Sequence, residues 1–349
     1  MNGGIYRLQS VYYIRSFTDA ATSNSHRISR IPMQKRGVEH VRIDAAQHGR
    51  RLDNFLTSHF GQVPKSRIYQ MIRRGEVRVN GGRVDPDYRL EEEDDVRVPP
   101  VLAPDPDRIA EVNIPRRLLE QLQASILYED ATLLVVDKPA GVPVHSGSGQ
   151  AYGIIDLARA LYPDDAALQL VHRLDRDTSG CLLIARDHRR LRELHEQFRS
   201  GRIRKRYTAL LQGNLRQVDI RVDVPLDREA RVRGERTVRA DADGSESRTR
   251  FRVLRQLPGA TLVSAVIATG RTHQIRVHAQ YIEHPVAGDD RYGNREFNRR
   301  MRRCGLKRIF LHAANIVIPR SPGPDLSLES PLPEDLQRAL ARLGGTPEP

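Results

Sequence analysis

Apolar and polar positions divide the chain into a small N-terminal region and a larger C-terminal one. In the small region, two helical repeats of apolar residues precede two alternating segments, at 52–56, 68–72, 76–79 and 95–98. The second repeat follows Pro64, a residue that commonly begins a helix. The first alternating segment runs into Asn80-Gly81, a dipeptide typical of a tight hairpin. We therefore expect two amphipathic helices and a short sheet between residues 40 and 98.

From residue 126 onward, short apolar runs of strand length recur between helical stretches. The pattern predicts strands at 132–136, 181–185, 207–211, 249–254, 261–267 and 309–311. It predicts helices at 153–161, 188–199, 272–282 and 334–343. Strands outnumber helices and do not alternate strictly with them, so the expected class is α+β with a mainly antiparallel sheet.

Composition shifts suggest where these regions begin and end. Residues 99–124, rich in Pro and Asp at their start, read as a linker with one short helix near 118–122. The larger domain then spans 125–333, and 334–349 form a C-terminal helix and tail. Residues 1–38 hold a single acidic residue, Asp19, and have some likeness to a transit peptide. Our preferred interpretation is an upstream extension that precedes a true start at Met33.

The charge balance points to an anionic partner. The formal net charge is +13 with 57 basic residues, of which only five are lysine. Arginine suits bidentate phosphate contacts and stacking on bases, although a GC-rich genome would also enrich it. Two cysteines without a CxxC motif predict a reducing cytosol and no cysteine zinc site. No apolar run approaches the ~18 residues of a membrane span, so we expect a soluble protein without a membrane partner.

The segment 172–180, HRLDRDTSG, places the carboxylate of Asp175 in a basic neighbourhood just before an apolar run. A lone aspartate in a loop is more often a turn or cap residue than a nucleophile. Three further segments occur at 138–145 (KPAGVPVH), 205–207 (KRY) and 270–278 (GRTHQIRVH). In this order and spacing the four segments resemble the RluA family of pseudouridine synthases. VPKS, LHEQFR and GDDRYGNREF look most like its RluC-type members, which modify large-subunit ribosomal RNA.

The small region, 40–98, resembles an S4 RNA-binding domain. Its second helix carries a basic face, ends at Gly75, and leads into the strand, the Asn-Gly turn and the last strand. The resemblance implies RNA contacts from Lys65, Arg67, Arg73 and Arg74. The alternative is an ordinary solvated helix face.

The family resemblance implies catalytic roles for three residues. Asp175 would attack a uridine held in RNA, and Arg276 would keep this carboxylate ionised, since a nearby guanidinium favours the charged form. Tyr207 would pack on the target ring, and its hydroxyl is a candidate for handling the C5 proton. Without the motifs, Tyr207 would pass for a core residue and Arg276 for a surface phosphate contact.

The resemblance also implies how RNA would be held. A stacked uridine must be extruded, and Arg173 matches the residue that fills the vacated space. Further RNA contacts are expected from His172, Arg204, Lys205 and Arg271. The arginine cluster from 299 to 308 would hold phosphates, with a solvated charge face as its main alternative. Where relatives usually have Gly-Lys, this chain has Gly244-Ser245, which puts phosphate contacts from that loop in doubt.

Uridine isomerisation involves no redox change, net hydrolysis or external atom, so we expect no cofactor. Several histidines invite a metal interpretation, but His273 and His278 are five residues apart and HExxH is absent. We therefore expect no metal and reject a metal-dependent nuclease. The expected protein is a monomer that acts on large-subunit ribosomal RNA or its assembly intermediates. The other alternative, an inactive RNA-binding assembly factor, would be free to lose Asp175, Tyr207 or Arg276.

Overall fold

The structure, a computed structural model, divides into two compact units, Met1–Asn113 and Ile114–Pro349. It describes residues 38–45, 47–60, 63, 65–100, 114–146, 151–165, 167–232 and 235–344. The expectations for residues 1–37, for Pro64 and for most of the linker lie outside the described residues. No helix in the described part of the chain is both long and apolar enough to cross a membrane.

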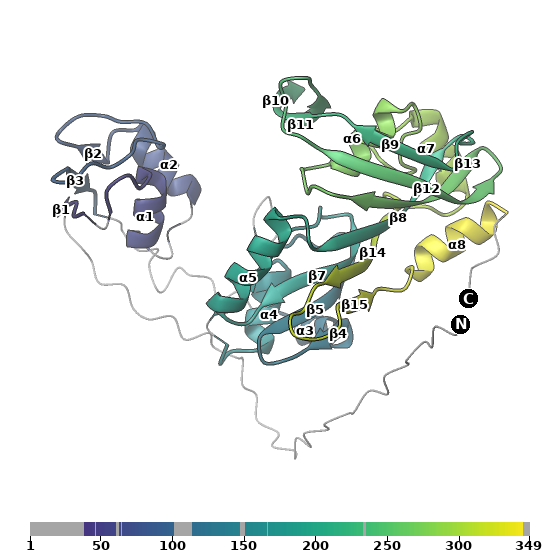
Figure 1. Cartoon of the computed structure of the whole chain (residues 1–349), viewed down its shortest axis with the longest axis horizontal. Coiled ribbons are helices and arrows are strands. Elements are labelled where there is room, and N and C mark those ends of the chain that lie inside the picture. Colours follow the sequence, from purple (N-terminus) through teal and green to yellow (C-terminus); the bar gives the residue numbers. More distant parts are fainter. Residues whose placement is uncertain are drawn as a thin grey trace, which may run out of the picture. The chain divides into compact units, whose positions relative to one another are not determined.

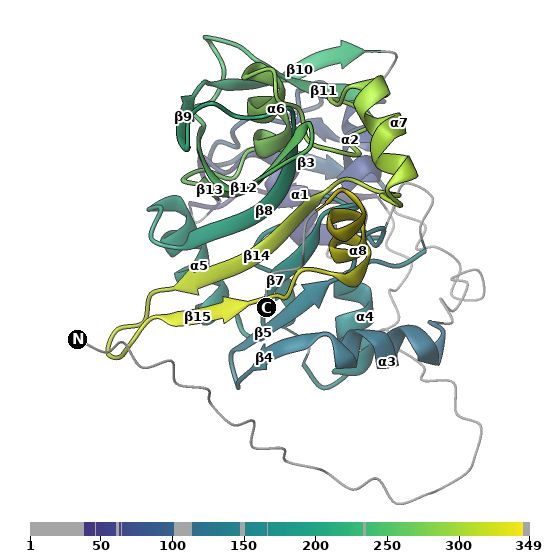
Figure 2. The ribbon, with the colours of Figure 1, turned by 90° about the vertical axis from the view of Figure 1, so that its right-hand side faces the viewer.

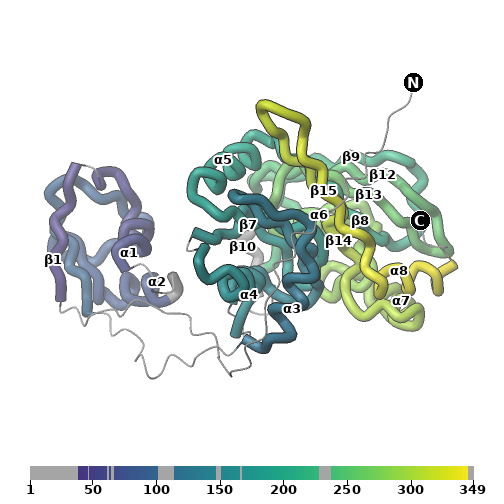
Figure 3. Tube along the Cα trace, turned by 90° about the horizontal axis from the view of Figure 1, so that it is seen from below, coloured from purple at the N-terminus to yellow at the C-terminus, as the bar shows by residue number. Residues whose placement is uncertain are grey.

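The small unit packs two helices, α1 (Leu52–Phe60) and α2 (Lys65–Arg73), beside a three-stranded antiparallel sheet. The strands lie in the order β1 (Glu39–Arg42), β3 (Asp95–Val98) and β2 (Arg78–Val79). α1 and α2 lie against each other in Figure 3. Asn80 and Gly81 both have positive φ, 49° and 76°, as a type I′ turn requires, so the expected turn is present.

The small unit has a hydrophobic core of its own. Leu52 and Leu56 from α1, Ile68 from α2 and Val96 from β3 are fully buried, and all residues of this core lie between Ile43 and Val98. The helical repeats seen in the sequence therefore form the buried faces of α1 and α2.

The larger unit is built on a ten-stranded sheet that is antiparallel at every described pairing except β14 with β7. Along the sheet the strands are β4 (Ile126–Glu129), β5 (Leu133–Lys138), β7 (Ser179–Ala185), β14 (Leu311–Ile318), β8 (Arg204–Gln212), β13 (Ala260–Ile267), β12 (Arg248–Leu257) and β9 (Asp219–Asp223). β15 (Leu326–Glu329) pairs with β14, and β6 (Gln169–Leu170) pairs with β7. A separate hairpin joins β10 (Leu226–Val232) to β11 (Glu235–Ala240). The expected α+β class is confirmed.

Helices cover both faces of this sheet (Figure 1). Alternate residues of β5 enter different cores: Leu134 packs with the core that includes α4 (Ile154–Leu161), and Leu133 packs with Leu194 of α5 (His188–Arg199). β5 and β7 thus read as nearly continuous apolar runs because both of their faces are buried. The remaining helices are α3 (Arg116–Ala124), α6 (Gln274–Tyr281), α7 (Arg295–Arg303) and α8 (Glu334–Arg342).

β14 joins the two halves of the sheet, and Figure 2 shows it between β7 and β8. His312 of β14 lies opposite Ser179 of β7 on one side and opposite Thr208 of β8 on the other. Gly180 has a φ of 111°, and a Cβ there would collide with the backbone of Ala313. Because β14 lies between β7 and β8, the start of β7 is two strand spacings, about 10 Å, from the middle of β8.

The structure contains strands that were not predicted, among them β4, β9, β10, β11 and β15, and it differs from the sequence prediction in three further places. α3 lies within the expected linker, but its Leu122 is buried in the larger unit's core, so that unit begins at residue 114 rather than 125. β14 begins at Leu311, where the predicted strand ended. α7 was not predicted, because its nine residues include only two apolar ones, Phe297 and Met301.

The separate cores predict that residues 114–349 fold alone. Deletion of residues 1–113 removes no side chain from the larger unit's hydrophobic clusters, because the small unit's core is built only from its own residues. We expect the truncated chain to unfold in one cooperative transition with nearly the same midpoint as the larger unit in the full chain. Calorimetry of both proteins measures this. An unfolded truncated chain would show that the two units depend on each other.

Candidate active site

Asp175 lies in the loop that connects β6 to β7, four residues before the strand begins. Its side chain is 26% exposed, so the carboxylate is partly enclosed but open to a ligand. The end of the motif anchors this loop to the sheet. Ser179 Oγ lies 2.9 Å from His312 Nδ1, and the amide of Thr178 donates to the carbonyl of Asp175 at 3.1 Å.

The buried side chain of Lys138 anchors the loop that carries Asp175. Its side chain is fully buried at the end of β5, and its ammonium donates to the carbonyls of Pro139, Val142 and Arg176 at 2.8–2.9 Å. Burial lowers the pKa of Lys138 to about 7, against the pull of Asp177 and Asp175. All three N–H donors of the charged form have acceptors, a geometry that favours the ammonium. One side chain thereby ties the KPAGVPV loop to the HRLDRD loop.

Arg276, on the first turn of α6, faces Asp175 but is held by Asp289. Its Nε and Nη2 donate to the two carboxylate oxygens of Asp289 at 2.7 and 2.8 Å, a bidentate pair. The remaining corner, Nη1, lies 3.4 Å from Asp175 Oδ2. Arg276 is 14% exposed and the Asp289 side chain 0%. The guanidinium is therefore fixed on its buried side and offers one donor to the more exposed carboxylate.

Asp289 is itself held by the backbone and by α7. Its Oδ1 accepts from the amides of Arg291 and Tyr292 at 2.9 and 3.0 Å, and its carbonyl accepts from Asn298 Nδ2 at 2.8 Å. Burial opposes the charged form of Asp289, but the Arg276 guanidinium and these amides outweigh it and lower the pKa of this carboxyl. Burial in turn lowers the pKa of Arg276, whereas Asp289 raises it more. Both groups stay charged.

A short hydrogen-bonded chain ends at His273, on the other side of Asp175. The amide of Val238, on β11, donates to Tyr292 Oη at 3.0 Å, and that oxygen lies 2.9 Å from His273 Nδ1. His273 Nε2 lies 3.8 Å from Asp175 Oδ2. Burial lowers the pKa of His273, so the ring is neutral at pH 7. A tautomer in which Nδ1 accepts from the Tyr292 hydroxyl carries its ring proton on Nε2, the nitrogen that faces Asp175.

Tyr207 lies in the middle of β8 with its ring in the main core. Burial raises the pKa of Tyr207 well above its ordinary value of 10, and the negative charge of Asp175 adds to the shift. Its hydroxyl is therefore protonated at neutral pH. Asp175 and Arg276 are 101 residues apart in the chain, yet their side chains approach to 3.4 Å. Tyr207 of β8 is close enough for the charge of Asp175 to raise its pKa.

The expected RNA contacts around Asp175 are of two kinds. Arg173 is exposed and has no hydrogen-bond or ion-pair partner among the described residues, and Arg271 is exposed with Nε on the carbonyl of Glu246 at 3.2 Å. Arg204 pairs with Asp325 at 3.2 Å and stays largely exposed. These three side chains are accessible to a polyanion.

His172 and Lys205 have packing partners inside the unit. His172 Nε2 accepts from the amide of Leu183 at 3.1 Å and its ring packs on Phe198, while burial, followed by the charge of Lys205, lowers its pKa to about 3. Lys205 is 8% exposed, its ammonium lies over the Phe198 ring, and burial lowers its pKa to about 8. His172 therefore brings no positive charge to RNA, and an RNA contact of either residue stays a prediction.

On α2 of the small unit, the expected basic face is partly neutralised. Arg67 donates to Gln70 at 2.9 Å and to Glu76 at 3.1 Å, and Arg74 lies 4.0 Å from Glu76. Arg73 donates through Nε to the carbonyl of Tyr69 at 3.3 Å, its one hydrogen bond to a described residue. Lys65 begins α2, but its side chain is outside the described residues. Arg73 keeps the most available charge of the three described arginines.

The sequence analysis did not identify Asp289, Tyr292 or His273 as site residues. Asp289 and Tyr292 lie in GDDRYGNREF, which contributed only to the family resemblance. Among the described residues, no cluster of three or more His, Cys, Asp or Glu side chains gathers as a metal site.

Two family models match parts of this chain. Residues 132–281 match a family model described as RNA pseudouridylate synthase, and residues 50–96 match the S4 domain. Both the HRLDRDTSG and GRTHQIRVH segments lie inside the first match.

Several curated relatives match nearly the whole chain. Ribosomal large subunit pseudouridine synthase C of Escherichia coli K12 is 46% identical over 309 residues, 88% of this chain and 97% of that protein. The same-named protein of Pasteurella multocida is 44% identical over 308 residues, 88% of this chain and 94% of that one. The solved structure of human RNA Pseudouridylate Synthase Domain Containing 4 is 26% identical, with a TM-score of 0.56 over 65% of this chain and 96% of that one.

The buried pair predicts a large stability effect of Asp289→Asn. The substitution leaves the Arg276 guanidinium buried without its counter-charge, which should lower the free energy of unfolding by about 3 kcal/mol at pH 7. Urea denaturation measures it. The pKa of Asp289 is lower in the folded state than its ordinary value of 3.8. Its contribution to the free energy of unfolding is therefore fully present above pH 3.8 and is lost as the pH falls through the folded-state pKa. The difference from wild type should shrink there.

Asp290→Asn is the matched control, because Asp290 is next to Asp289 in the chain but its side chain is 90% exposed. It should leave the free energy of unfolding unchanged. Equal effects of the two substitutions would show that the Asp289–Arg276 pair does not stabilise the fold.

Proposed function

This chain belongs to the RNA pseudouridylate synthase family, and we propose that it converts specific uridines of large-subunit ribosomal RNA to pseudouridine. The observation that carries the proposal is the partly exposed Asp175 carboxylate with the anchored Arg276 guanidinium 3.4 Å away. The printed names of the relatives, and the match of residues 50–96 to the S4 domain, support a ribosomal RNA substrate.

In the proposed reaction, the bond between C1′ and N1 of uridine breaks, the base turns, and C1′ bonds to C5. The C5 proton leaves and N1 gains a proton, so atoms and electrons balance without an oxidant, reductant or water. Asp175 acts as nucleophile or as the electrostatic partner of the sugar. Arg276, held by Asp289, supplies one donor to Asp175 at 3.4 Å.

Tyr207 serves two purposes in this proposal. Its ring gives the base an apolar surface on which to turn. Because burial raises its pKa, the hydroxyl acts as a hydrogen-bond donor or relays a proton, and it does not abstract the C5 proton as a phenolate.

The target uridine is extruded from its stack before it reaches Asp175, at a cost of a few kcal/mol. Arg173 lies two residues from Asp175, is exposed, and has no partner among the residues that the structure describes. We assign it to the space that the base leaves, where its planar head can hydrogen-bond the orphaned base. Arg271 and Arg204 contact neighbouring phosphates, and the small unit binds more distant RNA.

Asp175→Asn tests the catalytic assignment. The amide preserves shape but removes the charge, so isomerisation should be abolished while RNA binding stays within a few-fold, because phosphate contacts supply most of the affinity. Tritium release from C5-labelled uridine in a ribosomal RNA fragment measures the first, and filter binding the second. Wild-type tritium release by the variant would remove Asp175 from the mechanism.

Tyr207→Phe separates the ring from the hydroxyl. Since the ring stays, RNA affinity and the unfolding midpoint should hold, whereas turnover should fall by about 100-fold, the low end for a lost proton-transfer group. Single-turnover tritium release with the wild type as control measures this. An unchanged rate would leave Tyr207 with a packing role alone.

A further inference from the structure

α7 has two faces with different partners. Phe297, Asn298 and Met301 are buried. The Asn298 side chain holds the segment of Gly288 and Asp289, because it donates to the Asp289 carbonyl and accepts from the Gly288 amide, both at 2.8 Å. The opposite face is exposed and carries Arg295, Arg299, Arg300, Arg302 and Arg303. The helix that supports Asp289 therefore also presents a concentrated positive surface.

The positive charge of this face destabilises α7, and few acidic groups neutralise it. Arginines three and four residues apart, such as Arg299 with Arg302 and with Arg303, repel by a few tenths of a kcal/mol per pair. Within the described part of the chain, Arg299 and Arg303 have no hydrogen-bond or ion-pair partner, and Arg302 is only within 3.9 Å of Asp290. α7 holds one acidic residue, Glu296, against five arginines. A merely solvated face does not require such an imbalance.

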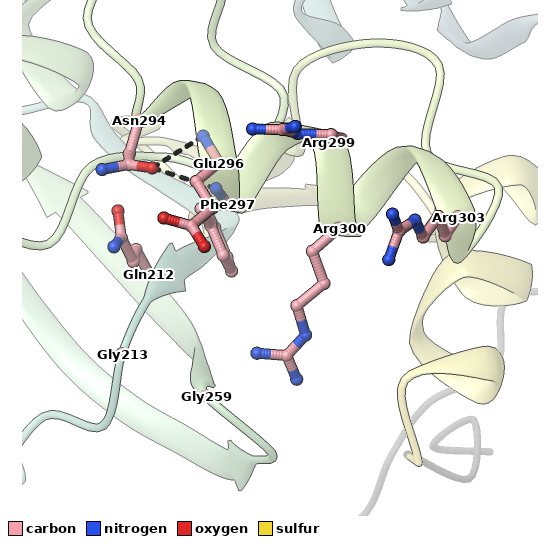
Figure 4. A pocket seen from close by; sticks show the side chains of 9 residues that line it. All are labelled: Gln212, Gly213, Gly259, Asn294, Glu296, Phe297, Arg299, Arg300 and Arg303. Carbon is pink, nitrogen blue, oxygen red and sulfur yellow. Dashed lines mark hydrogen bonds between the residues drawn. The ribbon is translucent and has the colours of Figure 1, made fainter.

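Two hollows flank this face, and Arg299 lines both. One, of about 520 Å³, is bounded by Arg299, Arg300, Arg303, Glu296 and the backbone at Gly259, and Figure 4 shows its side chains. Arg300 extends toward Gly259 and donates to the carbonyl of Pro258. The other, of about 390 Å³, is lined by Arg295, Arg299 and Arg302, among others. The arginines thus border concave spaces that are large enough for a phosphodiester group.

We propose that the exposed face of α7, centred on Arg299, binds backbone phosphates of the substrate RNA outside the target uridine. The inference rests on the proposed function and names a second contact surface for the same substrate. Charge complementarity selects the occupant, because a phosphate chain can engage several arginines at once. The bound strand would then lie on the helix whose Asn298 holds the Asp289 segment.

The test compares Arg299→Gln, Arg303→Gln and the double variant with Arg117→Gln, which removes an exposed arginine from α3. The full chain and a ribosomal RNA fragment that the wild type modifies are used. Each lost phosphate contact should weaken binding about five- to eightfold at 0.1 M salt and lower the salt slope by about 0.7–0.9. The loss should fall on KM rather than kcat. Glu296→Gln, which removes the opposing carboxylate, should strengthen binding.

The outcomes are distinguishable. Loss of affinity and salt slope in the α7 variants, with Arg117→Gln like wild type, supports the inference. If the wild type modifies RNA but the α7 variants match Arg117→Gln, α7 faces solvent or another partner and the inference is overturned. If the wild type makes no pseudouridine in any ribosomal RNA fragment, the proposed function fails and this surface loses its substrate with it. Circular dichroism of each variant checks that α7 is still folded.

Discussion

The site depends on the buried ion pair between Arg276 and Asp289. A buried charge is tolerated only when it is paired and hydrogen-bonded, and here two guanidinium donors, two backbone amides and Asn298 satisfy the pair and its segment. Because Asp289 fixes two of its three nitrogen atoms, Arg276 cannot collapse fully onto Asp175. The more exposed carboxylate keeps one donor nearby and remains accessible to a substrate.

Much of the motif sequence holds this arrangement together without touching a substrate. Gln274 binds Thr269, the Arg271 amide and the β12 backbone, and His278 lies between Thr249 and the carbonyl of Val224. Lys138 ties two loops together. Such groups must be hydrogen-bonded because they are buried, so replacing one of them leaves a buried partner unsatisfied.

The α+β class and several of the longer strands could be predicted from the sequence because apolar runs are local patterns. The motifs are local too and single out Asp175, Tyr207 and Arg276, whose roles stay a prediction. Asp289 was missed because its importance comes from a contact across the fold, which local pattern does not reveal. α7 was missed because its arginines obscure the apolar face of Phe297 and Met301. Lys205 and His172 both pack around Phe198, a contact across the fold that no local pattern indicates, and their contact with RNA stays a prediction.

A double-mutant cycle between Arg276 and Asp289, read as the single-turnover rate of tritium release, tests the central claim most directly. If Asp289 acts only by holding Arg276 toward Asp175, its replacement matters only while Arg276 is present. Asp289→Asn should slow the wild type but leave the rate of Arg276→Met unchanged. Losses that multiply in the double variant would show that the two residues act independently, and would contradict this account.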